Sequence, residues 1–398
     1  MIPRLCTLAL ALAAALAAQR TPYRAPSTDQ RIAALEQRLK QAPKDAAIQN
    51  ELAGAYLQKT RETADDAYLE RTARIVDAIL AADPSNYEAR RHRFEIEMQG
   101  HHFKKSVTLA HALLRERPDD YVTWGLLGDA LMELGEYDKA PDAYQKMVDL
   151  RPSLASYNRV AFYRFVTGDP EGAIMLMRKA IAIGAPAPEN VAWCWSDLGD
   201  ALFKTGAVDE AEKAYREALV LFPGFHHALA GLGHLQASRG RREEAIESFR
   251  RAQAAAPMPG YAAWLARLYG QLGREDLKRK QIEMLDAADK LTRAAGETAN
   301  RDLTLALADL DHNTARALEL ARAELETRGD VYTWDALAWA LFKNGQAEQA
   351  ASAMRKALAQ NTPEPAFREH AARIFAALGR PEPPSASSNR GPEGAIRP

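Results

Sequence analysis

Apolar residues recur with the spacing of an α-helix along most of this 398-residue chain. The clearest example is residues 121–152, where one helical face is formed by Trp124, Leu127, Gly128 and Leu131. A glycine turn, a second apolar face and a proline stop follow, at Gly135, Tyr137, Ala140, Tyr144, Met147 and Pro152. This order predicts two helices joined by a short turn. No stretch of the chain shows the alternation typical of a β-strand.

The same order returns twice later in the chain. The second copy contains Trp195, Leu198, Gly199, Leu202, Gly206, Ala211, Tyr215, Ala218 and Pro223. The third contains Leu229, Leu232, Gly233, Gly240, Ala245, Phe249, Ala252 and Pro257. Two short helices cannot bury their apolar faces alone, so the copies must stack on one another. Each large side chain buried between units stabilises the array by roughly 1.5–3 kcal/mol.

These copies resemble the tetratricopeptide repeat, whose signature is W-x2-L-G-x2-Y, then A-x3-F, then P, with a period of about 34 residues. The resemblance extends over Ala46–Leu378, with weaker copies between the strong ones. It implies an all-α, right-handed solenoid, or superhelix, of about nine helix-turn-helix repeats. In such an array the motif residues hold the fold, so Trp124→Ala should destabilise the protein rather than change its binding.

Changes in the pattern divide the chain into six segments. They are a signal peptide (1–18), a linker (19–29), an N-terminal repeat array (30–258), a divergent repeat with a long helix over 275–295 (259–297), a C-terminal array with a capping helix (298–380) and a disordered tail (381–398). The weak pattern in the divergent repeat makes it the candidate for a hinge between the two arrays. The tail is rich in Pro, Ser and Gly, which is typical of disorder.

The first residues indicate export. One basic residue, Arg4, precedes the uncharged stretch Leu5–Ala18, which is 14 residues long, whereas a membrane-spanning helix needs about 20. The stretch Ala15–Ala17 offers small residues at the spacing of a signal-peptide cleavage site. We therefore expect a cleaved signal peptide and a periplasmic or secreted protein with no transmembrane span. An uncleaved anchor and a chance alanine-rich helix are the open alternatives.

Charge and cysteine content exclude several classes of function. The chain has 52 basic and 53 acidic residues, so no overall charge directs it to nucleic acid. Only Cys194 remains after signal cleavage, which permits neither an intramolecular disulfide nor a thiolate zinc site. Nucleotide-binding, hydrolase and metalloprotease motifs are missing, so we expect no enzyme, no cofactor and no bound metal. The pairs His101–His102 and His227–His234 are weak candidates for metal ligands, and surface or groove-lining histidines are the favoured interpretation.

The resemblance also predicts where a partner binds. In tetratricopeptide arrays the first helix of each unit lines a concave groove through its second, fifth, ninth, twelfth and thirteenth positions. Carried onto this sequence, the groove residues are Arg91, Asp129, Asn158, Phe162, Trp193, Asp200, Phe203, Lys204, His227, His234, Tyr332, Asp335, Trp339, Phe342 and Lys343. Exposed aromatic residues in a concave surface are typical anchors for a partner, which favours Trp193, Phe203, Trp339 and the nearby Asp335. Packing between adjacent units is the alternative for the phenylalanines and tryptophans.

Protein–protein interaction is therefore the expected function. The chain would be a scaffold or adaptor outside the cytoplasm that docks an extended or helical partner segment in the groove. The alternative is a non-protein ligand of the cell envelope, such as a glycan or a peptidoglycan fragment, because aromatic rings beside carboxylates also suit sugars. A metal protein or enzyme built on the histidine-rich unit 226–257 has the weakest support. The Lys, Asn and Arg clamp by which cytosolic members of the family hold a terminal carboxylate is absent, since Asn158 lacks the matching lysines.

Overall fold

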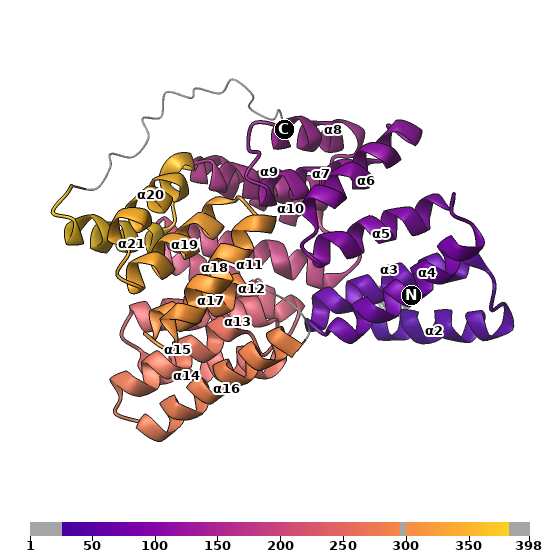
Figure 1. Cartoon of the computed structure of the whole chain (residues 1–398). Coiled ribbons are helices and arrows are strands. Elements are labelled where there is room, and N and C mark those ends of the chain that lie inside the picture. The colour runs from indigo at the N-terminus through magenta and orange to yellow at the C-terminus, as the bar shows by residue number, and fades with distance from the viewer. Residues whose placement is uncertain (1–25, 295–299, 382–398) are drawn as a thin grey trace, which may run out of the picture.

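The computed structural model describes residues 26–294 and 300–381, and every regular element in these ranges is a helix (Figure 1). The signal peptide predicted for residues 1–18 and almost all of the tail predicted for 381–398 lie outside the described residues. Within them, consecutive helices form nine hairpins, the number expected, flanked by the single helices α2 (Thr28–Gln41) and α21 (Pro365–Ala377). No described helix combines the length and the apolar character needed to cross a bilayer.

Each hairpin pairs an odd-numbered helix with the even-numbered helix that follows it. The pairs are α3 (Ala46–Thr63) and α4 (Asp66–Ala82), α5 (Tyr87–Gln99) and α6 (Phe103–Glu116), α7 (Tyr121–Glu133) and α8 (Ala140–Leu150), α9 (Leu154–Val166) and α10 (Pro170–Ile183), α11 (Pro188–Lys204) and α12 (Val208–Leu221), α13 (His226–Ser238) and α14 (Arg242–Ala255), α15 (Pro259–Gln271) and α16 (Glu275–Ala294), α17 (Arg301–Asp309) and α18 (Thr314–Thr327), and α19 (Val331–Lys343) and α20 (Ala347–Ala357). A 3-10 turn, η1 (Leu358–Gln360), follows α20. The long helix expected over 275–295 is α16, with 20 residues. The hinge expected around it stays a prediction.

Glycine and tyrosine bring the two helices of a hairpin together. In the hairpin α7/α8, a Cβ atom on Gly128 would lie 2.3 Å from Cε1 of Tyr144, so any larger residue would displace the ring. In the hairpin α11/α12, Gly199 faces Tyr215 in the same way, at 2.5 Å. Both tyrosine rings are fully buried. The repeated glycine is therefore a packing requirement of the repeat rather than a turn signal.

Two of the strongest repeats begin with the same helix cap. At the start of α7, the Asp120 carboxylate accepts a hydrogen bond from the backbone N–H of Thr123 and another, at 2.8 Å, from the Thr123 hydroxyl. At the start of α19, Asp330 accepts the equivalent pair from Thr333, with the hydroxyl at 2.6 Å. These caps satisfy N–H groups that a helix leaves unpaired in its first turn, and so they set where each repeat starts.

The superhelix closes on itself. In Figure 1 the C-terminal helices α17–α21, drawn in orange and yellow, lie against the middle of the chain. Three hydrogen bonds join the two parts: Gly329 N–H to the Glu133 carbonyl at 2.9 Å, Val331 N–H to the Tyr137 hydroxyl at 2.9 Å, and the Thr362 hydroxyl to the Val166 carbonyl at 2.6 Å. We call the contact made by these six residues the seam.

Apolar and charged side chains extend the seam. Val331 and Phe367 belong to the same buried apolar cluster as residues of α7–α11. Beside them, Arg328 forms ion pairs with Glu133 at 3.3 Å and with Glu324 at 3.2 Å. Burial raises the pKa of both carboxyl groups, and the guanidinium partly offsets this effect. The seam is therefore a packed interface and not a single point of contact.

Two glycines make the closest approach in the seam. Gly135 follows α7 with φ +74°, and a Cβ atom there would lie 2.3 Å from the carbonyl oxygen of Gly329. A Cβ atom on Gly329 would lie 2.6 Å from the carbonyl oxygen of Leu134. Both obstacles are backbone atoms, which cannot rotate away as a side chain can. Glycine is therefore needed on both sides of the contact.

Replacing Gly135 with alanine should loosen the seam, and Gly345 provides a matched control. Gly345 also has φ +74°, but a Cβ atom there would meet nothing within 4 Å. Alanine at either position is strained by about 1–2 kcal/mol, and overpacking should add about 1–3 kcal/mol at Gly135 only. We expect Gly135→Ala to have the lower melting temperature and the larger radius of gyration in small-angle X-ray scattering. Equal values for the two variants would contradict the role of the seam.

Candidate functional site

The odd-numbered helices form the inner layer of the superhelix. Successive members contact one another from α3 to α13 and again from α15 to α21, whereas the main contacts of the even-numbered helices are with elements adjacent in the chain. The groove residues predicted from the sequence all lie on odd-numbered helices, from α5 to α19. Their surroundings differ greatly from one helix to the next.

Toward the N-terminus, the predicted residues form ion pairs within the chain. Arg91 on α5 pairs with Glu88 and lies 3.5 Å from the Asp120 carboxylate. Asp129 on α7 accepts two hydrogen bonds from Nε of Arg159, at 3.1 and 2.9 Å. Charge-assisted pairs of this kind fix the orientation of both side chains. These residues support the inner layer and are not free for a ligand in this arrangement.

At the C-terminal end of α11, the predicted residues connect the inner layer to the rest of the chain. Lys204 forms an ion pair with Glu364, which precedes α21, at 2.7 Å. Asp200 accepts a hydrogen bond from the Tyr215 hydroxyl at 2.6 Å. Phe203 packs on the central apolar cluster, as the packing alternative expected. This end of α11 is therefore occupied by the chain itself.

The histidines of α13 are held among aromatic rings. The ring centroid of His234 lies 5.0 Å from that of Phe249 and 4.8 Å from that of Trp264. Burial lowers the pKa of His234 to about 4 and the pKa of His227 to about 3, so both imidazoles are neutral at physiological pH. In the part of the chain that the structure describes, no group of three His, Cys, Asp or Glu side chains is placed to hold a metal ion.

Trp339 and Asp335 on α19 are buried. Trp339 is only 3% exposed; its indole Nε1 donates to Asp309 at 2.9 Å, and its ring stacks on His370 with centroids 4.1 Å apart. Asp335 lies 2.9 Å from Nδ1 of the same histidine. Both side chains thus join α19 to its neighbours α17 and α21. They offer no surface to a partner in this arrangement.

The other predicted residues of α19 also have partners within the chain. The ring of Tyr332 lies 5.3 Å from that of Phe367. The ring of Phe342 stacks on the Trp339 indole, with centroids 5.4 Å apart. Lys343 forms an ion pair with Asp311 at 2.7 Å. The accessible part of the predicted groove is therefore elsewhere, on the middle helices.

Five residues of α9, α11 and α13 form a continuous patch in the inner layer. Asn158 Nδ2 donates to the Asp197 carboxylate at 3.1 Å, and the ring centroid of Trp193 lies 4.7 Å from that of His227. Phe162 lies four residues after Asn158, on the same face of α9, as Asp197 does after Trp193 on α11. Phe162 is 44% exposed and Trp193 is 36% exposed. We call these five residues the inner patch.

Asp197 is the member of the inner patch that the sequence analysis missed. It occupies the sixth position of its unit, outside the five positions carried over from the family, but its spacing of four residues from Trp193 indicates a shared face. Burial, and then the nearby Asp200, raise the pKa of Asp197 to about 7. Strongly shifted carboxyl groups are more frequent at functional sites than elsewhere, which makes this residue notable.

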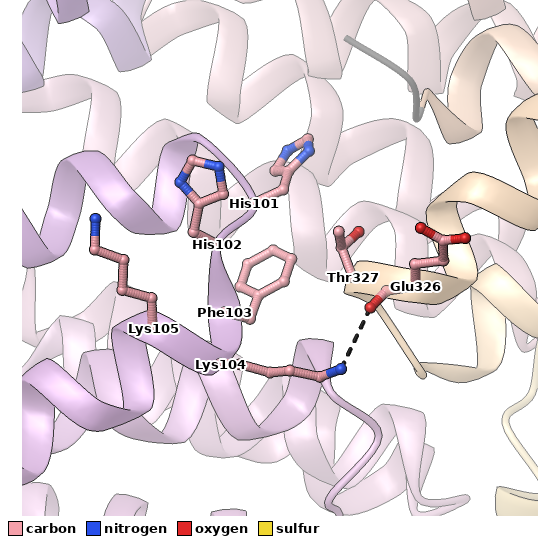
Figure 2. Close-up of a pocket in the computed structure, with 7 residues that line it drawn as sticks. All are labelled: His101, His102, Phe103, Lys104, Lys105, Glu326 and Thr327. Carbon is pink, nitrogen blue, oxygen red and sulfur yellow. Dashed lines mark hydrogen bonds between the residues drawn. The ribbon is translucent and has the colours of Figure 1, made fainter.

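A second concave feature lies on the outside of the array. The start of α6 and the end of α18 enclose a shallow hollow of about 350 Å³ that Figure 2 shows, lined by His101, His102, Phe103, Lys104, Lys105, Glu326 and Thr327. Lys104 Nζ donates across it to the Glu326 carbonyl at 3.4 Å. His102 and Lys105 both bind Glu97, at 2.8 and 2.7 Å. Three basic side chains of the hollow thus have partners within the chain.

Comparison with known families agrees with the repeat pattern. A family model described as tetratricopeptide repeat matches residues 93–155, 196–259 and 336–382. A second model with the same description matches residues 152–223. Together they cover more than half of the chain. No curated protein matches the sequence.

Several solved structures of low sequence identity are similar to this chain, and the first of these shares its fold. The human IFIT1 dimer with m7Gppp-AAAA is 16% identical, with 82% of this chain and 76% of that chain covered and a TM-score of 0.52. The Cut9 and Hcn1 complex of the APC/C is 15% identical with a TM-score of 0.47; the match covers 85% of this chain but only 56% of that chain. The type IV pilus biogenesis factor PilW is 17% identical, over 51% of this chain and 93% of that chain, with a TM-score of 0.44.

Removal of the Asp197 charge should stabilise the protein at high pH. Because the pKa of Asp197 in the folded protein, about 7, lies above its ordinary value of 3.8, stability falls as the pH rises from about 4 to about 7. Asp197→Asn abolishes this loss, so its melting temperature should exceed that of the parent by at least about 2 °C near pH 8 and by little near pH 4. The control is Asp142→Asn, an exposed position on α8. The prediction would be contradicted if the difference in melting temperature between Asp197→Asn and the parent stayed constant from about pH 4 to about pH 8.

Proposed function

Because this chain belongs to the tetratricopeptide repeat family, we propose that it is a protein-interaction scaffold or adaptor of the cell envelope that docks a partner segment on the inner patch. The repeats themselves support an interaction function in general. The envelope location is supported by the sequence of residues 1–18, which has the pattern of an export signal. The docking position is supported by the accessibility of the patch.

The exposure of Phe162 and Trp193 carries the proposal. Both belong to the aromatic residues predicted for the groove, and they are the two that remain exposed, whereas Phe203, Trp339 and Phe342 pack within the chain. Aromatic side chains of the inner layer that stay partly exposed can bury the rest of their surface against a ligand. They lie on neighbouring helices, so one extended segment can contact both.

Polar groups of the inner patch would give such a segment direction. The Asn158 amide and the Asp197 carboxylate lie between the two exposed aromatic residues and already form a hydrogen bond with each other. An amide can donate to a peptide carbonyl, and a carboxylate can accept from a peptide N–H. Anchors with polar groups between them are typical of protein interfaces.

A non-protein envelope ligand is the second candidate. The combination of an exposed indole with an amide and a carboxylate at 3.1 Å from each other also suits a sugar ring with its hydroxyl groups. A glycan or a peptidoglycan fragment would then occupy the same patch. The two candidates differ in the nature of the ligand and not in the residues that hold it.

Pull-down from the native cell envelope tests the docking site. The bait is residues 19–398 after chemical crosslinking, compared with the double variant Phe162→Ala, Trp193→Ala. The control double variant is Met175→Ala, Val220→Ala, which removes exposed apolar side chains of α10 and α12, outside the inner layer. We expect proteins captured by the parent to be retained by the control and lost by the inner-patch variant, with all baits equally folded by circular dichroism.

Two results would oppose the proposal. Retention of the partners by the inner-patch variant would move the docking site elsewhere. Absence of any specific protein, together with retention of the parent on immobilised peptidoglycan and loss of that retention in Trp193→Ala, would establish the second candidate instead.

A further inference from the structure

Building on the proposed docking function, we propose that the inner patch selects partner segments through a basic side chain, an arginine or lysine whose cation binds the Asp197 carboxylate beside the Trp193 ring. The proposal concerns the chemistry of the partner, which the repeat family does not specify. It rests on the pairing of charges in the inner layer, on the aromatic surface next to Asp197 and on the protonation state of the nearby histidine.

Asp197 is a carboxylate of the inner layer that forms no ion pair with any described residue. Its hydrogen-bond partners are both neutral, the amide of Asn158 at 3.1 Å and the indole of Trp193. Other carboxylates on or beside the inner helices have basic partners, in the pairs Asp129–Arg159 at 2.9 Å, Asp309–Arg267 at 3.0 Å, Asp335–His370 at 2.9 Å and Glu364–Lys204 at 2.7 Å. Glu189 and Asp200 also lack an ion-pair partner within the described ranges. Glu189 is only 1% exposed and accepts a hydrogen bond from Gln58, and Asp200 accepts one from the Tyr215 hydroxyl at 2.6 Å.

The basic groups nearest to Asp197 are already engaged. Lys204, two turns along α11, binds Glu364. Arg159, next to Asn158 on α9, binds Asp129. His227 on α13 is neutral because burial lowers its pKa to about 3. Lys204 therefore acts on this carboxylate only from a distance, as the last of the causes that shift its pKa, and no basic side chain of the described residues pairs with it. A ligand can supply such a partner.

The surroundings of Asp197 suit a cation with an apolar stem. Trp193 lies one helical turn away on the same face of α11 and is 36% exposed, and Phe162 on α9 is 44% exposed. Guanidinium and ammonium groups bind tryptophan faces by cation–π attraction, and their methylene stems pack on aromatic rings. Arginine combines this stacking with two-pronged hydrogen bonding to a carboxylate, so arginine should be preferred over lysine. The raised pKa of Asp197 agrees with a carboxylate that lacks its partner.

A random peptide library displayed on phage tests the proposal with the full mature chain as the target. Selection on the parent should enrich peptides with arginine or lysine at one position. The same selection on Asp197→Asn should lose this preference, and Asp142→Asn should keep it. Asp197→Lys should reverse it toward Asp and Glu. Melting curves establish that each target is folded.

Affinity measurements on one selected peptide make the test quantitative. Replacement of its arginine with citrulline, the neutral analogue, should weaken binding to the parent by about tenfold or more, as should Asp197→Asn with the arginine peptide. If the two groups bind each other, the two changes combined should cost little more than either alone.

Each outcome separates this proposal from the docking function. A preference for basic residues, together with losses of affinity that are not additive, would support both the basic-residue proposal and the docking function. Two results would overturn the basic-residue proposal and leave the docking function standing. One is that the selected peptides show no preference for basic residues. The other is that replacing arginine with citrulline weakens binding equally in the parent and in Asp197→Asn. If the parent selects no peptide at all, both proposals for a protein partner would be overturned.

Discussion

The arrangement of the whole chain depends on the backbone contact at which Gly135 meets Gly329. In an open solenoid each repeat contacts only its neighbours. Here the contact brings the ninth hairpin against the third, and the loop before α21 then reaches α11, where Glu364 binds Lys204. Part of the inner layer is covered by the chain as a result. The accessible part is reduced to the middle helices, α9 to α13.

The hairpins could be predicted from the sequence because they depend on local spacing. Gly128 and Tyr144 are close in the chain, and the same pair recurs as Gly199 and Tyr215, so one unit explains the others. The seam could not be predicted in this way, because it joins residues such as Tyr137 and Val331 that no repeat pattern relates. The burial of Trp339 was expected only as the alternative, because its partners Asp309 and His370 lie on two other helices, α17 and α21.

The candidate site shows a comparable division between shared and individual residues. Asp129 and Asp200 occupy equivalent positions, and each accepts a hydrogen bond from the tyrosine of its own hairpin, at 3.0 and 2.6 Å. Such residues stabilise the repeat wherever they occur. Asp197 has no equivalent role, and its importance comes from Asn158 on the preceding inner helix. Position within the repeat therefore predicted which residues face inward, but not which of them remain available.

Closure of the superhelix limits how the protein can change in evolution. Repeat arrays commonly gain or lose whole units, because one unit more or less leaves every neighbouring contact intact. Tyr137 and Val331 are 194 residues apart and must meet at hydrogen-bond distance. One additional or missing hairpin between them would carry Val331 along and around the superhelix by a full unit and would separate the two. Duplication and deletion of units should therefore be selected against between α8 and α18.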